Sequence, residues 1–424
     1  MPPATNTSRR FTISLALILV CGVTVGFLLL IAAYAIPVSP IAGNVKLSAQ
    51  ALDGSWQTGE IPYEQLVKGY LTTQLDNTTD ATMLMAAAHE NNLPLIRRAI
   101  NVPTYTYHGT YTALLEYAQN GTANLRSSDS ARYWLGFLIW LKPLLCVFSY
   151  MDIRALQMAL QLLLLGGVLF CLQHRGLSIA APAFMLSLLA VTPAVTGFSM
   201  QFSSVYTLYL LASLVLLCRP RLARPGFPAA AFFLLAGMAT SYFDYLTYPI
   251  ATFGVPFLLH TLLYPSGSRM AALRRFALLL GAWLAGYFGM WAGKWVLAML
   301  LSGDGWFLPN LLAKVNERSS FVTQGDSFSY LAVLRAVLGI FAKKAYLVLA
   351  LLLLLLYAAT AGRLLHLRKH GRAPLSQKVS TKGITARGQG LSFALVGLLP
   401  FVWFAMASNH TINHAFFTDR KSVV

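Results

Sequence analysis

The chain has 424 residues, of which 57% are hydrophobic and 11% are charged. A soluble globular protein carries roughly 25% charged residues, so this composition excludes that class. The formal net charge of +18 could suggest a nucleic-acid partner, but the positions of the charges along the chain give another explanation. Single cysteines in apolar segments indicate small core residues rather than a metal site or a disulfide framework: Cys21, Cys146, Cys171 and Cys218. The composition predicts an all-α polytopic membrane protein.

Nine apolar runs approach the length of about 20 residues that a membrane-spanning helix needs. Arg9 and Arg10 precede the first run, which places residues 1–10 in the cytoplasm. A cleaved signal peptide is the alternative, because "AYA" at 33–35 resembles a cleavage site, although the run is long for a signal core. The predicted spans are 11–36, 153–173, 178–196, 203–218, 226–243, 248–264, 276–301, 345–362 and 391–407.

The placement of charges supports this threading. Half of the 32 basic residues fall in the segments predicted to be cytoplasmic, above all the loop 363–390, and all 14 acidic residues fall on the opposite side. Positive-inside bias does not require so complete an exclusion of acidic residues, and a wrong threading would scatter them. The basic excess therefore reflects topology, with anionic lipid heads rather than nucleic acid as its partners.

The longest segment predicted outside the membrane is residues 37–152, which is too long for a simple connector. Its stretch 63–100 is rich in Leu, Met and Ala and predicts helices. The stretch 133–149 is aromatic with Lys142 inside it, which is typical of a helix at the membrane interface. The remaining predicted parts are a membrane bundle at 153–407 with a second outer loop at 302–344, and a polar outer segment at 408–418.

Three polar clusters fall on the predicted outer face, and the first, "QLDNTTDATML", holds Asp76 and Asp80. Two carboxylates four residues apart on a helix share a face and repel each other. Such a pair can raise the pKa of one member and supply a general base, or it can hold a divalent cation. A solvated helix face, with Asp80 near a helix start, is the alternative interpretation.

The second cluster, "SYFDYLTYP", places Asp244 beside Tyr245 within a long run of otherwise uncharged residues. An ionised carboxylate is costly in hydrocarbon, so such residues usually face a polar cavity. We predict that Asp244 lines a cavity open to the outside, one ligand pocket's width or less from His410 or His414. The alternative is an interfacial aspartate that accepts hydrogen bonds from the tyrosines of an aromatic belt.

The third cluster, "ASNHTINHAFFT", follows the last predicted span and holds Asn409, His410 and His414. Neutral imidazoles at this spacing can bind a metal, hold a phosphate or donate to a sugar hydroxyl. No glutamate follows either histidine, which argues against a zinc-protease motif. An ordinary polar helix end is the alternative.

A long first outer loop with an acidic helix after the first span resembles the GT-C class of integral-membrane glycosyltransferases. Four stretches are similar to uncharacterised bacterial membrane proteins of that build: "LDNTTDATML", "RYWLGFLIWLKPLL", "YFDYLTYP" and "NHTINHAFFT". The resemblance implies a polyprenyl-phosphate-linked sugar as donor and an outer-loop carboxylate as base or metal partner. One departure is Leu135, which stands where the resemblance leads us to expect a histidine after "RYW".

Carried onto this sequence, the resemblance implies that Asp80 or Asp76 is the catalytic base and that Asp244, Tyr245, Asn409, His410 and His414 bind substrate. Loss of a lipid phosphate leaves negative charge that needs a cation, for which the outer-face candidates are Arg97, Arg98, Arg132 and Lys142. A divalent cation could serve the same purpose, but the sequence identifies no ligand set for one.

The predicted function is a membrane glycosyltransferase of the bacterial cytoplasmic membrane. It would move a sugar from a polyprenyl-phosphate donor to a cell-envelope acceptor on the outer face. A transporter or flippase for an envelope lipid is the first alternative, and proline-interrupted spans favour it, but no inverted repeat is evident. A non-catalytic envelope-assembly protein is the second. Polar groups gathered on one face favour the enzyme.

The last six residues, "DRKSVV", match the translation of a widely used sequencing adapter. We expect residues 419–424 to be a sequencing artefact and the natural chain to continue in frame beyond Thr418.

Overall fold

The computed structural model describes residues 4–53, 64–177, 180–190, 193–302, 307–323, 326–369 and 386–413. Most of these residues are helical, and the strands among them form two small antiparallel pairs. Several predictions lie outside the described residues, namely His414, the artefact expected at 419–424 and most of the basic loop 363–390.

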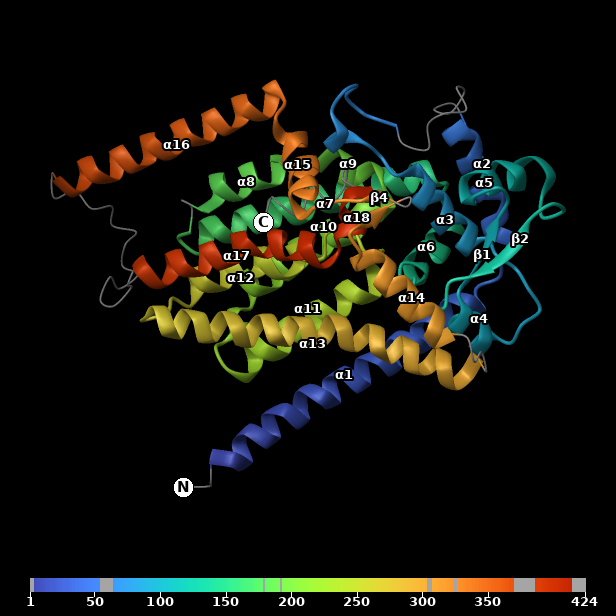
Figure 1. The fold of residues 1–424 in the computed structure, drawn as a ribbon, viewed down its shortest axis with the longest axis horizontal. Helices are drawn as coiled ribbons and strands as arrows, with labels where there is room; N and C mark the ends of the chain where they lie inside the picture. Colours follow the sequence, from blue (N-terminus) through green and yellow to red (C-terminus); the bar gives the residue numbers. More distant parts are fainter. Residues whose placement is uncertain are drawn as a thin grey trace.

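Five helices of the described chain are long and apolar enough to cross a membrane, which fits the predicted all-α membrane class. They are α1 (Ala4–Ala35), α7 (Tyr150–His174), α10 (Met200–Cys218), α13 (Arg269–Ser302) and α17 (Ala386–Met406). A sixth candidate is the pair α15 (Tyr330–Phe341) and α16 (Lys344–Lys369), which meet at an angle of 80°. Figure 1 shows the long helices side by side across the molecule, with α16 standing apart from the bundle.

Judged by length and composition, the described ranges contain five candidate spans, or six if the bent pair is one span, against the nine predicted from the sequence. The span predicted at 178–196 is divided into α8 (Ala180–Ala190) and α9 (Pro193–Phe198). The spans predicted at 226–243 and 248–264 are α11 (Phe227–Phe243) and α12 (Ala251–Leu263), apolar helices of 17 and 13 residues. At about 1.5 Å per residue, both fall short of a hydrocarbon core about 30 Å thick.

Helices α11 and α13 form the most extensive helix pair of the described bundle. Two glycines permit this close approach, because a Cβ at Gly237 would collide with the backbone of Trp283, and one at Gly286 would collide with the backbone of Leu234. Small residues at a crossing allow two helix backbones to come together, as is common in membranes. Helix α13 of this pair also contacts helices of the outer parts, namely α4 (Leu95–Asn101) and α14 (Phe307–Ser319).

Contacts between helix ends agree with the predicted threading. The rings of Phe11 and Phe227 lie 5.6 Å apart, and Arg175 Nε donates to the carbonyl of Leu217 at 2.8 Å. The short turn η2 (Pro220–Ala223) joins α10 to α11 at this end. These helix ends are all predicted to be cytoplasmic. The cytoplasmic assignment of this side remains a prediction.

The first outer segment folds into a helical unit with one small sheet, on the right of Figure 1. Its elements are α2 (Ser39–Asp53), the 3-10 turn η1 (Leu71–Thr73), α3 (Asn77–Ala87), α4 (Leu95–Asn101), β1 (Pro103–Thr106), α5 (Thr110–Asn120), β2 (Arg126–Asp129) and α6 (Leu138–Leu145). The helices predicted within 63–100 correspond to α3 and α4, whereas residues 64–76 are otherwise a loop. The pairing of β1 with β2, in which Thr104 lies opposite Ser128, was not predicted.

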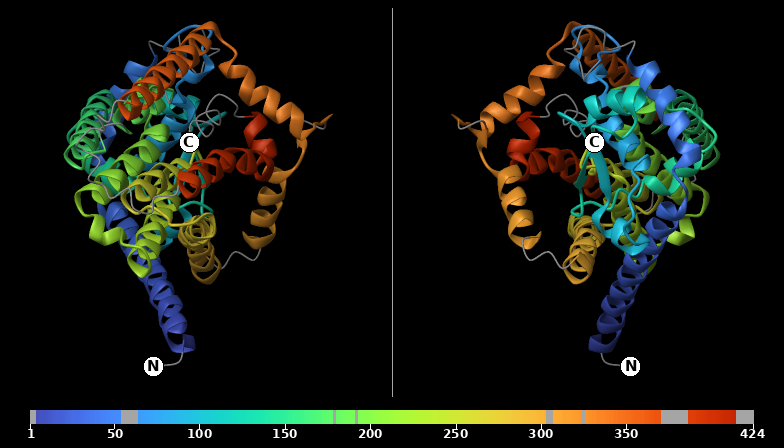
Figure 2. Two further views of the ribbon diagram at one scale, coloured as in Figure 1. Left: turned by 90° about the vertical axis from the view of Figure 1, so that its left-hand side faces the viewer. Right: turned by 90° about the vertical axis from the view of Figure 1, so that its right-hand side faces the viewer.

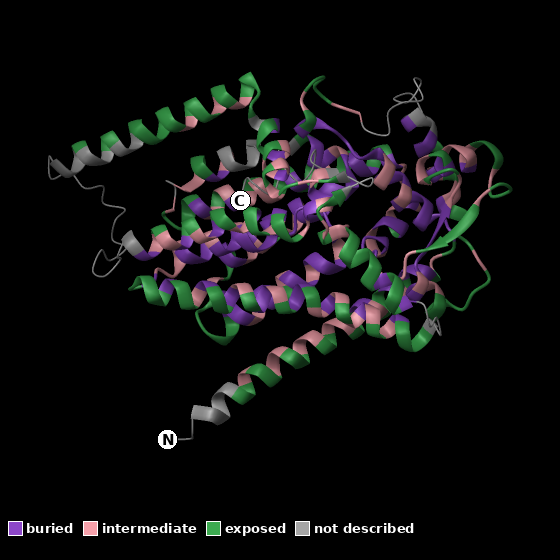
Figure 3. Ribbon diagram, viewed as in Figure 1, coloured by how far each residue is buried: buried purple, intermediate pink, exposed green. Residues whose placement is uncertain are grey.

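The core of this outer unit is built on α3, whose residues 83–87 are all buried. Figure 3 shows buried residues concentrated in this unit and in the centre of the bundle, whereas α16 is largely exposed. The second outer loop contains α14 (Phe307–Ser319), β3 (Val322–Thr323) and β4 (Asp326–Ser327). Helices α14 and α15 both contact α18 (Ser408–Asn413), and Figure 2 shows them as an arc beside the end of α17.

Candidate functional site

Asp80 is fully buried, and its carboxylate faces the start of α10. It accepts hydrogen bonds from the backbone N–H groups of Met200 at 3.2 Å and Gln201 at 3.1 Å. The hydroxyl of Tyr150 also donates to it, and the guanidinium of Arg154 lies 3.9 Å away. The first N–H groups of a helix lack intrahelical partners and carry partial positive charge. Asp80 therefore caps α10 from a distant part of the chain.

This environment is that of a structural charge. Burial raises the pKa of Asp80, while Arg154 and the hydrogen bonds from Tyr150 and α10 lower it. The carboxylate has no exposed surface, and donors reach both of its oxygens. A role for Asp80 as catalytic base would require α3 and α10 to separate, and it stays a prediction.

Asp76 occupies the N-cap of α3 and is not on the face of that helix. Its carboxylate accepts from the backbone N–H and from the hydroxyl of Thr79, both at 2.9 Å. Aspartate is a favoured N-cap because it satisfies the free N–H groups of the first turn. Since the helix begins at Asn77, Asp76 turns back to cap it and Asp80 turns away to α10. The expected pair of carboxylates on one helix face is therefore not formed.

Asp244 ends α11 and opens a tight turn, with 8% of its surface exposed. Its carboxylate accepts from the backbone N–H of Thr247 at 3.0 Å and from the hydroxyl of Thr247 at 2.5 Å. Within the turn, Leu246 has a φ of 66°, a left-handed conformation uncommon outside glycine. Its carbonyl accepts from His410 Nε2 at 3.2 Å. The structure thus brings the second and third predicted clusters together at this turn.

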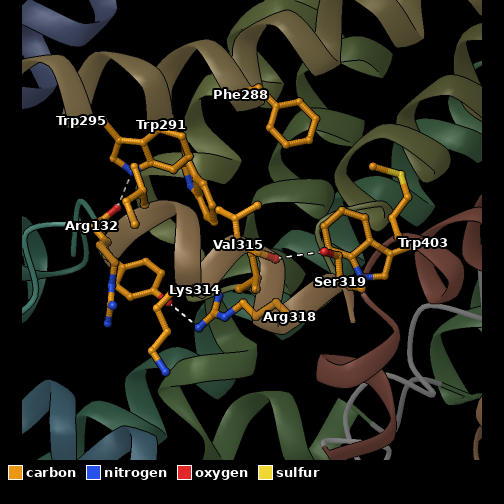
Figure 4. A pocket seen from close by; sticks show the side chains of 14 residues that line it. Arg132, Phe288, Trp291, Trp295, Lys314, Val315, Arg318, Ser319 and Trp403 are labelled. Atoms are coloured by element: carbon orange, nitrogen blue, oxygen red, sulfur yellow. Dashed lines mark hydrogen bonds between the residues drawn. The ribbon is translucent and has the colours of Figure 1, made fainter. Parts of the chain in front are cut away.

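A cavity of about 190 Å³ adjoins the turn, with Leu246 in its wall. Its other walls come from α13, α14, the end of α17 and the segment 130–137, which connects β2 to α6. The lining combines five aromatic and three basic side chains, namely Tyr133, Phe288, Trp291, Trp295, Trp403, Arg132, Lys314 and Arg318. Figure 4 shows Trp291 and Trp295 beside Arg132 on one side and Trp403 on the other. We call this cavity the outer pocket.

Tyr133 joins the aromatic and the basic parts of the outer pocket. Arg318 donates to its hydroxyl, and the guanidinium carbons of Arg318 and Arg132 lie 5.7 and 5.9 Å from the centre of its ring. The ring of Tyr245 packs against it with 4.9 Å between centroids. Cation–π contacts position a guanidinium without neutralising it. Both arginines therefore remain able to attract an anion.

Tyr245 links the outer pocket to the first polar cluster. Burial raises the pKa of Tyr245, and the charges of Arg318, Arg132 and Asp76 act on the same hydroxyl. Of the two carboxylates of the first cluster, Asp76 is the one whose charge acts on Tyr245, and the Tyr245 ring packs against the pocket residue Tyr133.

Indole hydrogen bonds fix the segment 130–137 to α13 in both directions. Trp295 Nε1 donates to the carbonyl of Arg132 at 3.1 Å, and Trp134 Nε1 donates to the carbonyl of Met290 at 2.8 Å. A tryptophan N–H needs a partner when it is buried, so each bond both satisfies a donor and sets a register. The basic wall of the pocket is thereby held against the bundle.

Two residues of the same segment adopt special geometry. Leu135 has a φ of 48° and a buried side chain. The next residue, Gly136, donates its N–H to the carbonyl of Tyr242 at 3.0 Å. A side chain at Gly136 would collide with Tyr242. Left-handed non-glycine residues are costly and concentrate at functional sites, and here Leu135 and Leu246 both flank the outer pocket.

The remaining predicted residues lie elsewhere. Lys142 is fully buried in α6 against the ring of Tyr34 and is not among the residues that line the outer pocket. Asn409 donates to the carbonyl of Val322 in β3, beside α18. Of the predicted substrate-binding residues, Arg132 lines the pocket, while Tyr245 and His410 contact residues of its wall.

Sequence reasoning missed most of the pocket, although α13 carried a readable signal. Aromatic residues recur there at every fourth position, as Trp283, Tyr287, Trp291 and Trp295. Neighbouring rings along this aromatic ladder lie 5.1, 5.9 and 5.5 Å apart. Residues four apart share a helix face, so the spacing alone predicts one aromatic stripe. Nothing comparable marks Arg318.

Among the described residues, no group of three or more His, Cys, Asp or Glu side chains could hold a metal ion. The suggested divalent cation therefore stays a prediction. A comparison of the chain with protein-family models, with curated proteins and with solved structures found no match.

Proposed function

We propose that this protein is a glycosyltransferase of a bacterial cytoplasmic membrane. It transfers a sugar from a polyprenyl-phosphate donor to a cell-envelope acceptor at the outer pocket. One observation carries the proposal, namely the meeting of aromatic walls with the arginines Arg132 and Arg318 at the predicted outer end of the bundle. Aromatic faces pack against sugar rings, and arginines are the residues best suited to phosphate.

The size and the surroundings of the outer pocket suit a headgroup. At about 190 Å³ it is smaller than most ligand sites, which measure roughly 300–1,000 Å³. It fits one sugar ring or one phosphate rather than a whole lipid. Two of its lining residues, Phe288 and Met406, are exposed apolar side chains on α13 and α17. They offer a path along which the lipid chain of the donor leaves the pocket toward the membrane.

In the proposed reaction the acceptor displaces polyprenyl phosphate from the sugar. A hydroxyl oxygen of the acceptor attacks the anomeric carbon, and the bond from that carbon to the phosphate oxygen breaks. The polyprenyl phosphate leaves with the electron pair, and Arg318 and Arg132 stabilise its charge. The acceptor proton passes to a carboxylate. Asp76 and Asp80 are the candidates for this role; both are buried, and each must give up a helix-capping hydrogen bond before it can take the proton.

The main alternative, a lipid transporter, finds less support. A transporter needs ionisable groups at mid-depth that can change partners. Lys294 of α13 is buried, and its amine donates to the carbonyls of Ala99 and Ile100, each at 2.8 Å. These two bonds satisfy carbonyls at the C-terminal end of α4, so Lys294 stabilises the fold.

The test uses the purified full-length chain in lipid nanodiscs with polyprenyl-phosphate-linked hexoses as donors and a cell-envelope fraction as acceptor. Release of polyprenyl phosphate, measured by mass spectrometry, should depend on both the acceptor and Arg318. The matched control is Arg335→Met, because Arg335 is an exposed arginine on α15. Equal release by the wild type, Arg318→Met and a protein-free nanodisc would rule out transfer at the outer pocket.

A further inference from the structure

Four polar side chains from separate elements meet inside the outer unit. They are Tyr34 of α1, His89 after α3, Arg98 of α4 and Lys142 of α6. Lys142 Nζ lies 5.4 Å and the guanidinium carbon of Arg98 lies 5.3 Å from the centre of the Tyr34 ring. Arg98 also donates to the carbonyl of His89 at 3.4 Å. Tyr34, His89 and Lys142 are each no more than 1% exposed.

This group has donors that no acceptor in the described chain satisfies. The buried atoms without a hydrogen-bond partner are Lys142 Nζ, Arg98 Nε, Tyr34 OH and His89 Nδ1. The lysine and arginine nitrogens can only donate, and the tyrosine hydroxyl can donate as well. Leaving buried donors unpaired costs stability, above all when they are charged. A ligand rich in hydrogen-bond acceptors would therefore satisfy these donors.

The charge of the group is also unbalanced. The ion pairs of the described residues lie elsewhere, and the carboxylates Glu90 and Asp129 act on the group only from a distance. Burial lowers the pKa of Lys142 to about 8, with Arg98 adding to the effect, so the amine still carries its proton at neutral pH. Burial likewise lowers the pKa of His89 to about 4, which leaves the imidazole neutral. Two cations thus share one aromatic ring without a negative partner.

We propose that Arg98, Lys142 and Tyr34 bind an anion of the phosphate type at the outer end of α1. Tyr34 is the second-last residue of this candidate span, which places the group at the level where the membrane surface is expected. Arg98 is only half-buried, so an anion can approach from its side. The phosphate oxygens accept from the amine of Lys142, the guanidinium of Arg98 and the hydroxyl of Tyr34. This site is separate from the outer pocket and does not depend on sugar transfer.

A phosphate group can reach this site as free inorganic phosphate or as the headgroup of a lipid. Thermal unfolding of the purified chain in detergent, followed by circular dichroism, tests the first source when inorganic phosphate is titrated at constant ionic strength. Nanodiscs of phosphatidylglycerol against phosphatidylcholine, without free phosphate, test the second. We expect one source to raise the melting temperature of the wild type by about 2–4 °C at saturation.

Variants tie this rise to the proposed site. Lys142→Met and Tyr34→Phe should each abolish most of it, whereas Arg97→Met, the exposed neighbour of Arg98 on α4, should retain it. Tyr34→Phe removes a single hydroxyl, so it keeps the test valid if Lys142→Met does not fold. The proposal fails if neither source changes the melting temperature of the wild type. It fails equally if Tyr34→Phe and Arg97→Met respond as the wild type does.

Discussion

Two polar regions on the same side of the bundle differ in how their charges are satisfied. Around Asp80, a single carboxylate receives backbone N–H groups, a tyrosine hydroxyl and a nearby arginine, and no surface is left exposed. At the outer pocket, Arg132 and Arg318 rest on an aromatic ring, and no carboxylate pairs with either among the described residues. The carboxylate of Asp80 is satisfied by the protein, although Nε of the neighbouring Arg154 has no hydrogen-bond partner in the described chain, whereas the two pocket arginines have no carboxylate partner there.

Whether a charge has a protein partner tells structural charges from functional ones better than residue type does. A buried carboxylate was the natural choice for a base, yet its hydrogen bonds are those of a helix cap. Arg318 of α14 was not among the predicted site residues, yet it lies in the wall of the outer pocket, where an anion would be held. Complete pairing indicates a contribution to stability, whereas incomplete pairing beside a cavity indicates a place for a ligand.

The strongest test of this contrast is Asp80→Ala. It leaves Arg154 buried without its partner and uncaps α10, so the free energy of unfolding should fall by about 3–5 kcal/mol. Denaturation in mixed detergent micelles measures the change. If the variant were as stable as the wild type and had lost only transfer activity, Asp80 would be the base after all.

The second test is Arg318→Met in the outer pocket. Its charge makes no ion pair within the described chain, so the variant loses mainly the hydrogen bond to Tyr133, and stability should change by only about 1 kcal/mol. Transfer should fall about 100-fold, as is typical when a group that stabilises leaving charge is removed. The transfer assay and an unfolding curve are recorded on the same sample, with Arg335→Met beside it. A large loss of stability with normal transfer would reverse the contrast between the two regions.

The third test, Gly136→Ala, strains the wall of the pocket without touching a charge. The new methyl group would lie 2.5 Å from the carbonyl oxygen of Tyr242, and overpacking of this kind costs about 1–3 kcal/mol. The control is Gly281→Ala on α13, where a Cβ meets nothing within 4 Å and should stabilise the helix slightly. Equal unfolding curves for the two variants would show that the segment 130–137 is free to move.

Asp244→Asn should affect transfer less than Arg318→Met does. An asparagine retains an acceptor for the N–H of Thr247, so unfolding should change by about 1 kcal/mol. Transfer should fall about 10-fold if the charge of Asp244 orients the substrate, since one such interaction contributes roughly 1.4 kcal/mol. Thr247→Val weakens the same turn and keeps the charge. Identical transfer rates in these two variants would leave only the aromatic-belt interpretation of Asp244.

Features that depend on local pattern were predictable from the sequence. Apolar runs predicted the helical membrane class, and a helix start near Asp80 was one of the two interpretations of the first polar cluster. The number of spans was not predictable, because α11 and α12 are apolar but short. Hydropathy alone does not tell a full crossing from a shorter buried helix.

Features that depend on distant contacts were not predictable. Asp80 meets the start of α10 some 120 residues later, and Arg318 meets Tyr133 across 185 residues. No local spacing encodes either contact. Of the residues singled out from the sequence, Arg132 lines the outer pocket, while Tyr245 and His410 contact residues of its wall. The aromatic ladder is a local pattern, and its four-residue spacing alone is enough to predict it.

The aromatic ladder of α13 also gives the molecule an intrinsic optical readout. Three of the eight tryptophans of the chain, Trp291, Trp295 and Trp403, line the outer pocket. Excitation absorbed by Tyr287 can pass to the indoles stacked above it, because the rings are about 6 Å apart or closer. A sugar or phosphate that enters the pocket replaces water around these indoles and changes the colour and intensity of their emission. Ligands can therefore be screened by light alone, with no label attached.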